Sequence, residues 1–235
     1  MIPNISVAIV GAPKSGKTHL ALTLTPPIVV YSFDVRGADL LLPKFKGKQI
    51  VVKPFIPPIS DTLEPDEGAP KFWQAIKADY QKTVDSGEFK TVVLDPATML
   101  WEIIRDAWQV AKHKQHLMSR DYGDANRSMA WVLTYPLLKG MNVVSINYLR
   151  DKYVDDQATG EKEIDGFKRT EGLVDVILQT VMKEKPTSAE ERKATKRETK
   201  SVVVTRVEKC RFDRDLNGME LTDATFEDVA TLLGA

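Results

Sequence analysis

Gly11-Ala12-Pro13-Lys14-Ser15-Gly16-Lys17-Thr18 is the stretch that decides the fold of this 235-residue chain. It matches the P-loop pattern G-x-x-x-x-G-K-[ST], in which glycines let the backbone curl and turn its N–H groups toward phosphate oxygens. Residues 6–10, just before it, are apolar and β-branched and predict a buried strand. Residues 17–24 predict a helix. Because a functional P-loop lies between a strand and a helix, this context argues against a chance glycine-rich turn.

The motif predicts a nucleoside-triphosphate site with Mg²⁺. Lys17 would contact the β- and γ-phosphates, and the Thr18 hydroxyl would ligate Mg²⁺. The N-terminus of the following helix adds a positive dipole end. The candidate nucleotide-binding residues are Gly11, Ala12, Pro13, Lys14, Ser15, Gly16, Lys17, Thr18 and His19. We therefore expect ATP and Mg²⁺ as cofactors, although no motif selects ATP over GTP.

Two other predicted strands end in a carboxylate. Residues 91–94 are an apolar strand followed by Asp95, and residues 28–33 are followed by Asp34. In P-loop folds such an aspartate holds Mg²⁺, usually through water, so Asp95 is a candidate metal ligand beside Thr18. The alternative role for Asp95 is the N-cap of the next helix. Asp34 is a second candidate for the same pocket.

The chain alternates between strand and helix patterns. We predict strands at 6–10, 28–33, 49–52, 91–94, 142–146, 173–182 and 201–207, and helices at 17–24, 72–84, 100–114, 124–139 and 225–233. This order predicts an α/β fold with a mostly parallel central sheet, helices on both faces and an antiparallel C-terminal extension. The proline-rich stretch 53–70 predicts a loop. We expect one domain over residues 1–235, with the charged stretch 183–200 as an exposed excursion or mobile hairpin.

The composition excludes several classes of protein. Lys+Arg and Asp+Glu are both 33, so no overall basic field attracts nucleic acid, and any such contact requires local patches. Cys210 is the only cysteine, which excludes an internal disulfide and argues against a cysteine-based zinc site. His19, His113 and His116 form no ligand set with nearby acids. No apolar run approaches the roughly 20 residues of a membrane span, and we expect a cytoplasmic protein.

A longer segment carries a family resemblance. Val144-Ser145-Ile146-Asn147-Tyr148-Leu149-Arg150-Asp151-Lys152 is similar to the RecA segment that has an apolar strand, Asn-Gln, an apolar residue, Arg, any residue and Lys. With the P-loop and Asp95, residues 5–182 resemble the RecA-like ATPases. They most resemble the phage RecA-core proteins described as AAA-type nucleotide-binding or single-strand annealing proteins. Residues 209–212, Lys-Cys-Arg-Phe, also look like that phage family. For a phage-encoded protein, the expected cytoplasmic location is the cytoplasm of the host cell.

The resemblance implies a RecA-like P-loop NTPase core and further roles. Asn147, at the strand end, would sense the γ-phosphate and signal to a DNA-binding loop at residues 153–166. Lys168 and Arg169 would contact the γ-phosphate of a neighbouring subunit, which implies a homo-oligomer, ring or filament, with nucleotide between subunits. The alternative is a solvated Lys-Arg pair at a loop end. The catalytic candidates are therefore Lys17, Asp34, Asp95, Asn147, Lys168 and Arg169.

Two residues depart from the family pattern. Arg36 stands where the family has a glutamate that orients the attacking water, and an arginine accepts no proton. Either Asp34 takes that role or hydrolysis is slow. Tyr148 stands in the place of the sensing glutamine, which leaves Asn147 as the better sensor candidate.

Basic residues gather around phenylalanines at three places. The clusters are Lys44, Lys46 and Lys48 near Phe45; Lys162, Lys168 and Arg169 near Phe167; and Arg206, Lys209, Arg211 and Arg214 near Phe212. Cations interleaved with aromatic rings suit single-stranded nucleic acid, although such clusters are also ordinary solvated surface.

The leading hypothesis is an ATP-hydrolysing protein that binds single-stranded DNA in recombination or annealing, with a single-strand-binding protein as a candidate partner. A small-molecule kinase, which shares the P-loop and the chain length, is an alternative. Residues 183–200 contain Arg192 and Arg197 and could be mistaken for the arginine-rich lid of such a kinase, but they lie after the sixth strand. A non-hydrolysing nucleotide switch is another alternative, suggested by Arg36.

Overall fold

The computed structural model describes residues 4–35, 37–57, 66–114, 116–154, 157–196 and 198–233. It contains an eight-stranded sheet of order β10-β9-β8-β1-β5-β4-β2-β3. Six strands are parallel: β1 (Ser6–Val10), β2 (Ile28–Ser32), β3 (Ile50–Pro54), β4 (Thr91–Asp95), β5 (Asn142–Asn147) and β8 (Val176–Pro186). Two are antiparallel: β9 (Thr199–Cys210) and β10 (Glu220–Thr222). The predicted fold class is confirmed.

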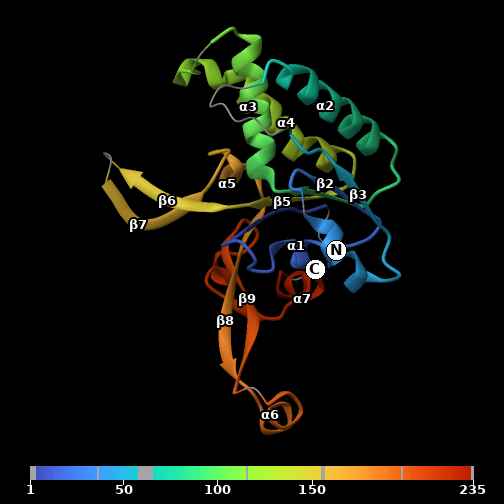
Figure 1. The fold of residues 1–235 in the computed structure, drawn as a ribbon, viewed down its shortest axis with the longest axis vertical. Coiled ribbons are helices and arrows are strands. Elements are labelled where there is room, and N and C mark those ends of the chain that lie inside the picture. The colour runs from blue at the N-terminus through green and yellow to red at the C-terminus, as the bar shows by residue number, and fades with distance from the viewer. Residues whose placement is uncertain are drawn as a thin grey trace.

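Helices cover both faces of this sheet (Figure 1). One face carries α2 (Ala69–Asp85), α3 (Ala97–Ala111) and α4 (Gly123–Leu138). The opposite face carries α1 (Lys17–Ala21) and α7 (Phe226–Leu232). The shorter elements are the 3-10 helices η1 (Ala38–Phe45), η2 (Ser119–Tyr122) and η3 (Arg214–Leu216), and the helices α5 (Thr170–Leu173) and α6 (Ala189–Thr195).

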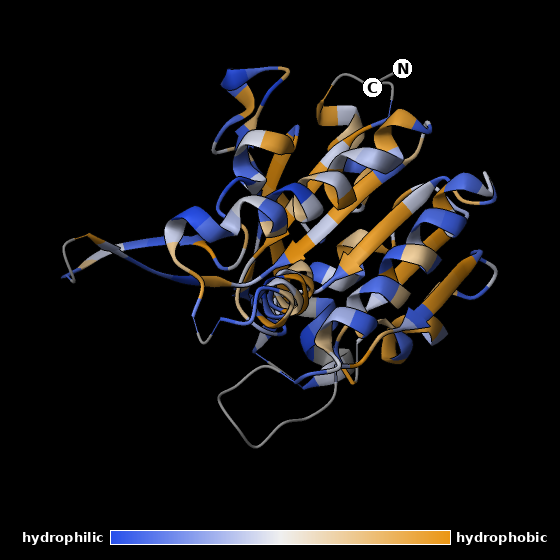
Figure 2. Cartoon of the chain, turned by 90° about the horizontal axis from the view of Figure 1, so that it is seen from above, coloured by the Kyte–Doolittle hydropathy of each residue, from blue (hydrophilic) through white to orange (hydrophobic). Residues whose placement is uncertain are grey.

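The core divides along the alternation of the strands. In β2, Val29 and Tyr31 pack among residues of α2, α3 and α4, whereas Ile28 and Val30 pack among residues of α1 and α7. Successive strand side chains point to opposite faces, so a strand covered on both sides must be apolar throughout. Figure 2 shows the hydrophobic strands between amphipathic helices.

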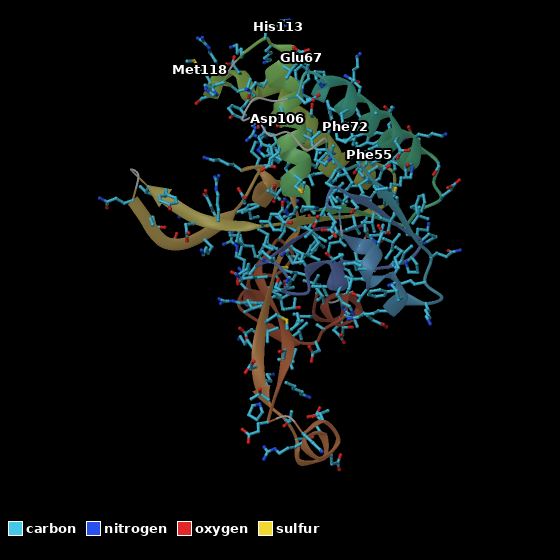
Figure 3. The ribbon with its side chains drawn as sticks, viewed as in Figure 1. Phe55, Glu67, Phe72, Asp106, His113 and Met118 are labelled. Carbon is cyan, nitrogen blue, oxygen red and sulfur yellow. The ribbon has the colours of Figure 1, made fainter. Side chains whose placement is uncertain are left out.

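Helix α2 is attached to the sheet by aromatic packing. Trp73, Ile76 and Tyr80, which the helical periodicity places on one face, are all buried. Phe72, in the first turn of α2, has its ring centroid 6.4 Å from that of Phe55, which follows β3 (Figure 3).

Two hairpins leave the body of the protein (Figure 1). The first, β6 (Leu149–Val154) with β7 (Gln157–Ile164), forms a hairpin over most of residues 153–166, so the expected loop conformation there is wrong. Cross-strand ion pairs, such as Arg150–Glu163 and Lys162–Asp151, stabilise these strands without apolar alternation. The second is the outer part of β8 and β9 with α6 at its end, where the charged excursion 183–200 was expected.

Several boundaries also differ from the prediction. Helix α1 ends at Ala21 rather than residue 24, because two consecutive prolines, Pro26 and Pro27, follow and cannot continue a helix. Helix α3 begins three residues earlier than expected, directly after Pro96. Strand β10 was not predicted. Within the described residues, no helix is long and apolar enough to cross a membrane.

Candidate nucleotide site

The P-loop, residues 11–18, joins the end of β1 to α1 and requires glycine at two positions. Gly11 and Gly16 have φ angles of 151° and 94°. A Cβ on Gly11 would lie 2.4 Å from the carbonyl oxygen of Thr180 in β8, and a Cβ on Gly16 would lie 3.0 Å from Val203 in β9. The loop is therefore packed against β8 and β9, and the Ser15 and Thr180 hydroxyls share a 2.7 Å hydrogen bond across the contact with β8.

Lys17 lies at the mouth of the loop. Its amino group donates to the carbonyl oxygens of Gly11, at 2.8 Å, and Ala12, at 2.7 Å. Burial lowers the pKa of this amine, while the charge of Asp95 raises it. The amine also lies 5.4 Å from the centroid of the Tyr148 ring, a cation–π contact. A phosphate group entering the loop would thus meet a partly desolvated cation.

The side-chain oxygens of Thr18 and Asp95 lie next to each other. The Thr18 hydroxyl donates to Asp95 Oδ2 at 2.9 Å, and Asp95 is only 6% exposed. The pKa of Asp95 is raised to about 6, chiefly by burial and to a smaller extent by the negative charge of Asp34, against the lowering effects of the Thr18 hydrogen bond and the Lys17 charge. Asp34 itself is exposed. A hydroxyl beside a carboxylate suits Mg²⁺, which prefers hard oxygen ligands, so these residues fit the expected cofactor.

Comparisons with known proteins agree with this geometry. The sequence profile of the family described as AAA domain matches residues 3–207. The chain belongs to the AAA domain family. A search of curated proteins found no match to this AAA domain protein.

Two solved structures resemble the AAA domain chain in fold. The RadB recombinase has a TM-score of 0.53 and 17% identity, over 94% of this chain and 86% of that one. A KaiC-like protein from the archaeon Pyrococcus horikoshii OT3 has a TM-score of 0.50 and 14% identity, over 94% of this chain and 84% of that one. The expected RecA-like P-loop core is thereby confirmed.

Strand β5 brings the sensing candidates of this AAA domain to the P-loop. Asn147 pairs with Val10, the last residue of β1, but its amide nitrogen donates to the backbone and side-chain oxygens of Ser145, both at 3.1 Å. Tyr148, the next residue, places its ring beside Lys17. The aromatic residue, rather than the asparagine amide, therefore contacts Lys17 of the P-loop.

A hydrogen-bond bridge ties the end of β5 to the β6–β7 hairpin and to α3. The Tyr148 amide donates to the Thr98 hydroxyl at 3.1 Å, and that hydroxyl donates to the Asp165 carbonyl at 3.0 Å. The Asp165 amide in turn donates to the Tyr148 carbonyl at 2.9 Å. Thr98 lies in the first turn of α3, just after Asp95. These hydrogen bonds therefore connect the start of α3, next to Asp95, to the base of the β6–β7 hairpin.

Lys168 and Arg169 do not line the P-loop cleft of their own chain. They are exposed and line a second cleft of about 430 Å³ at the base of the hairpin, together with Arg105, Tyr122 and Arg150. Among the described residues, no side chain forms an ion pair with Lys168 or Arg169. Arg36, which departs from the family pattern, lies outside the described residues.

The P-loop cleft contains residues that the motif does not predict. Its volume is about 440 Å³, and its lining beyond the loop includes residues of η1, β8 and β9 and the turn 223–225. Within the described part of the chain, residues 183–200 do not line it, which agrees with the argument that they are not the lid of a kinase. The pairing of β8 with β9 brings Met182 and Val203 to the cleft. Such pairing between distant segments produces no recognisable motif in the sequence.

His19 belongs to the wall of this cleft and packs against Phe45, with ring centroids 5.1 Å apart. Burial lowers the pKa of its imidazole, and Lys44 lowers it further. His113 lies at the far end of α3 (Figure 3). In the described part of the chain, no group of three or more His, Cys, Asp or Glu residues could hold a metal ion.

Proposed function

We propose that this protein is a Mg²⁺-dependent ATPase that binds single-stranded DNA in phage-type recombination or annealing and works as a homo-oligomer. The proposal that the protein binds and hydrolyses ATP rests on one observation, that Lys17, Thr18 and Asp95 lie together at the P-loop. The proposal that it binds single-stranded DNA rests on the RecA-like fold and on the basic cleft that Lys168 and Arg169 line at the base of the β6–β7 hairpin.

Each residue of the P-loop site has a chemical task in this proposal. The Lys17 amine exchanges the carbonyl oxygens of Gly11 and Ala12 for β- and γ-phosphate oxygens. Thr18 and Asp95 would hold Mg²⁺, which would supply positive charge to neutralise the phosphates. Asp34, whose charge acts on Asp95, is the candidate to orient the attacking water.

Charge favours the cleft over the hairpin as the DNA contact. Residues 149–165 contain three basic and six acidic side chains, so the hairpin repels phosphates as a whole. Its basic residues Arg150, Lys152 and Lys162 each pair with an acid across the hairpin. Lys168 and Arg169 are exposed beside Tyr122, a combination of cations and an aromatic ring that suits a single strand.

The first test is ATP hydrolysis with Mg²⁺, with and without single-stranded DNA, for wild type and Lys17→Ala. Turnover that DNA stimulates and that the variant loses supports the proposal. Tight nucleotide binding without DNA-dependent turnover contradicts it and favours the nucleotide switch, or a kinase to be sought with small acceptors.

A second test separates the two roles that Lys168 and Arg169 have in this proposal. The double variant Lys168→Ala/Arg169→Ala is compared with Lys152→Ala/Lys162→Ala, which removes two paired hairpin cations. If the cleft binds DNA, only the first pair weakens DNA binding, and the slope of log K against log salt falls by about 0.7 for each lost phosphate contact. Unchanged DNA binding with lost turnover instead assigns both residues to a neighbour's γ-phosphate.

A further inference from the structure

The P-loop cleft extends past the phosphate-binding residues. Beyond the loop it is lined by Leu41 and Lys44 of η1, by Met182 and Val203, and by the turn 223–225. Because phosphates occupy the loop in the proposed function, the nucleoside of the same ligand must lie in this remaining part. Leu41, Met182 and Val203 supply apolar surface from separate elements, as expected for a site that packs a planar base.

Asp223 is the carboxylate in this outer part of the cleft. Its backbone is left-handed, with φ 48°, and its amide donates to the Val203 carbonyl at 2.7 Å. The Val203 amide donates back to Asp223 Oδ1 at 2.8 Å. This two-bond ring fixes the carboxylate in orientation, and the Val203 side chain in turn abuts Gly16 of the P-loop. Asp223 is therefore held at a set position relative to the phosphates.

The second carboxylate oxygen is available to a ligand. Of the two carboxylate oxygens of Asp223, only Oδ1 accepts a hydrogen bond from the described part of the chain. An ionised carboxylate is an acceptor only, so its partner must bring an O–H or N–H group. A nucleoside has both kinds, in the ribose hydroxyls and in the amino groups of the base. An acceptor already fixed in place binds such a donor with little further loss of conformational freedom.

We propose that Asp223 is a specificity-determining residue that accepts a hydrogen bond from the nucleoside of the bound nucleotide. This inference rests on the proposed function, because it requires a nucleotide whose phosphates lie in the P-loop. It adds a recognition element that the P-loop motif lacks, since the motif contacts only phosphates and Mg²⁺.

Asp223→Asn is the informative variant. The asparagine keeps one oxygen to accept from the Val203 amide and replaces the other oxygen with an N–H donor. Asp213→Asn is a matched control, because Asp213 also accepts a backbone amide, that of Asp215 at 2.8 Å, but does not line the cleft. Dissociation constants are measured with Mg²⁺ for ATP, 2′-deoxy-ATP, GTP and inorganic triphosphate.

The expected result is that Asp223→Asn weakens ATP binding by roughly ten- to a hundredfold, the range for a lost hydrogen bond to a charged group, and leaves inorganic triphosphate unchanged. Asp213→Asn changes neither. If the donor is a ribose hydroxyl, wild type prefers ATP to 2′-deoxy-ATP and the variant does not. If it is a base amino group, the variant instead changes the ratio of ATP to GTP affinity.

Unchanged ATP affinity in Asp223→Asn, or an equal loss of ATP and triphosphate affinity, overturns this inference while the proposed function stands. Wild-type protein that binds neither ATP nor inorganic triphosphate overturns both.

Discussion

Thr18 and Asp95 lie 77 residues apart in the chain, and the threonine hydroxyl donates a 2.9 Å hydrogen bond to the aspartate carboxylate. Two parts of the fold create this contact. The P-loop ends at α1, and β4 delivers Asp95 from two strands away in the sheet. Their meeting creates an oxygen-rich position for Mg²⁺, but it also buries a carboxylate whose ionised form is poorly solvated.

Asp95→Asn should therefore stabilise the protein in the absence of Mg²⁺ and nucleotide at neutral pH. A pKa of about 6, against 3.8 for an unperturbed aspartate, corresponds to at most about 3 kcal/mol of destabilisation by the ionised carboxylate. Because the folded-state pKa is raised, this cost is absent below pH 3.8 and grows as pH rises toward 6. Urea denaturation should show the variant more stable than wild type at pH 8, with a smaller difference at pH 5.

A constant difference between Asp95→Asn and wild type at the two pH values would contradict that prediction. The same substitution should weaken Mg²⁺-dependent nucleotide binding, because a neutral amide replaces the carboxylate ligand. Gain of stability together with loss of ligand binding is the pattern expected of a residue retained for function.

Gly11→Ala should severely destabilise the protein. The added Cβ would meet the Thr180 carbonyl oxygen at 2.4 Å, so backbone must move at the junction of the P-loop and β8. Urea denaturation should show a loss of about 3 kcal/mol or more. Gly87→Ala is the control, since its φ is also positive, at 68°, but no atom lies within 4 Å. That variant should lose only about 1 kcal/mol, from backbone strain alone; equal losses would refute the steric explanation.

Thr98→Val should loosen the junction between the sheet and the β6–β7 hairpin. The substitution keeps the side-chain shape but leaves the Tyr148 amide and the Asp165 carbonyl without their shared hydroxyl, at a cost of about 1–3 kcal/mol. Hydrogen exchange at the Tyr148 amide should accelerate, whereas Thr98→Ser should remain close to wild type. Wild-type exchange in Thr98→Val would show that the bridge is not needed.

Removal of the hairpin should leave the nucleotide site intact. Strands β6 and β7 form their own two-stranded sheet, and of their described residues only Leu149 and Ile164, at the base, pack with a core cluster. A variant in which residues 151–162 are replaced by Asn-Gly should fold, since this dipeptide favours a tight hairpin turn. It should bind Mg²⁺-ATP within roughly threefold of wild type, a change of less than about 1 kcal/mol. Loss of folding, seen by circular dichroism, would mean that the hairpin supports the core.

The sequence predicts the inner part of the molecule better than its projections. Strands such as β1 and β5 are apolar because both faces are covered, and such runs are visible in a single sequence. The β6–β7 hairpin has no apolar alternation, because ion pairs rather than burial hold it, so residues 153–166 look like a polar loop. Helix α6 did leave a signal, the capping box from Ser188 to Glu191, within a stretch that has no hydrophobic periodicity.

The candidate site shows the same division. The P-loop and Asp95 are visible because local chemistry requires glycines, a lysine and a carboxylate at a strand end. Thr180, Val203 and Asp223 come to the site only through the order of strands in the sheet. A threonine, a valine or an aspartate in a β-rich segment is common, so a single sequence gives no sign that these three belong to the site. Tyr148 was identified as a departure, but its contact with Lys17 depends on the register of β5 against β1.

The residues that pack against the P-loop come much later in the sequence than the loop itself. Thr180 is 165 positions beyond its hydrogen-bond partner Ser15, and Val203, which contacts Gly16, lies further along the chain. A ribosome making this chain therefore releases the P-loop long before the strands that pack against it exist. Nascent chains that end before Val203 contain the P-loop but lack the part of β9 that packs against it. In the proposed function, the ability to bind nucleotide would therefore arise only after Val203 has been synthesised.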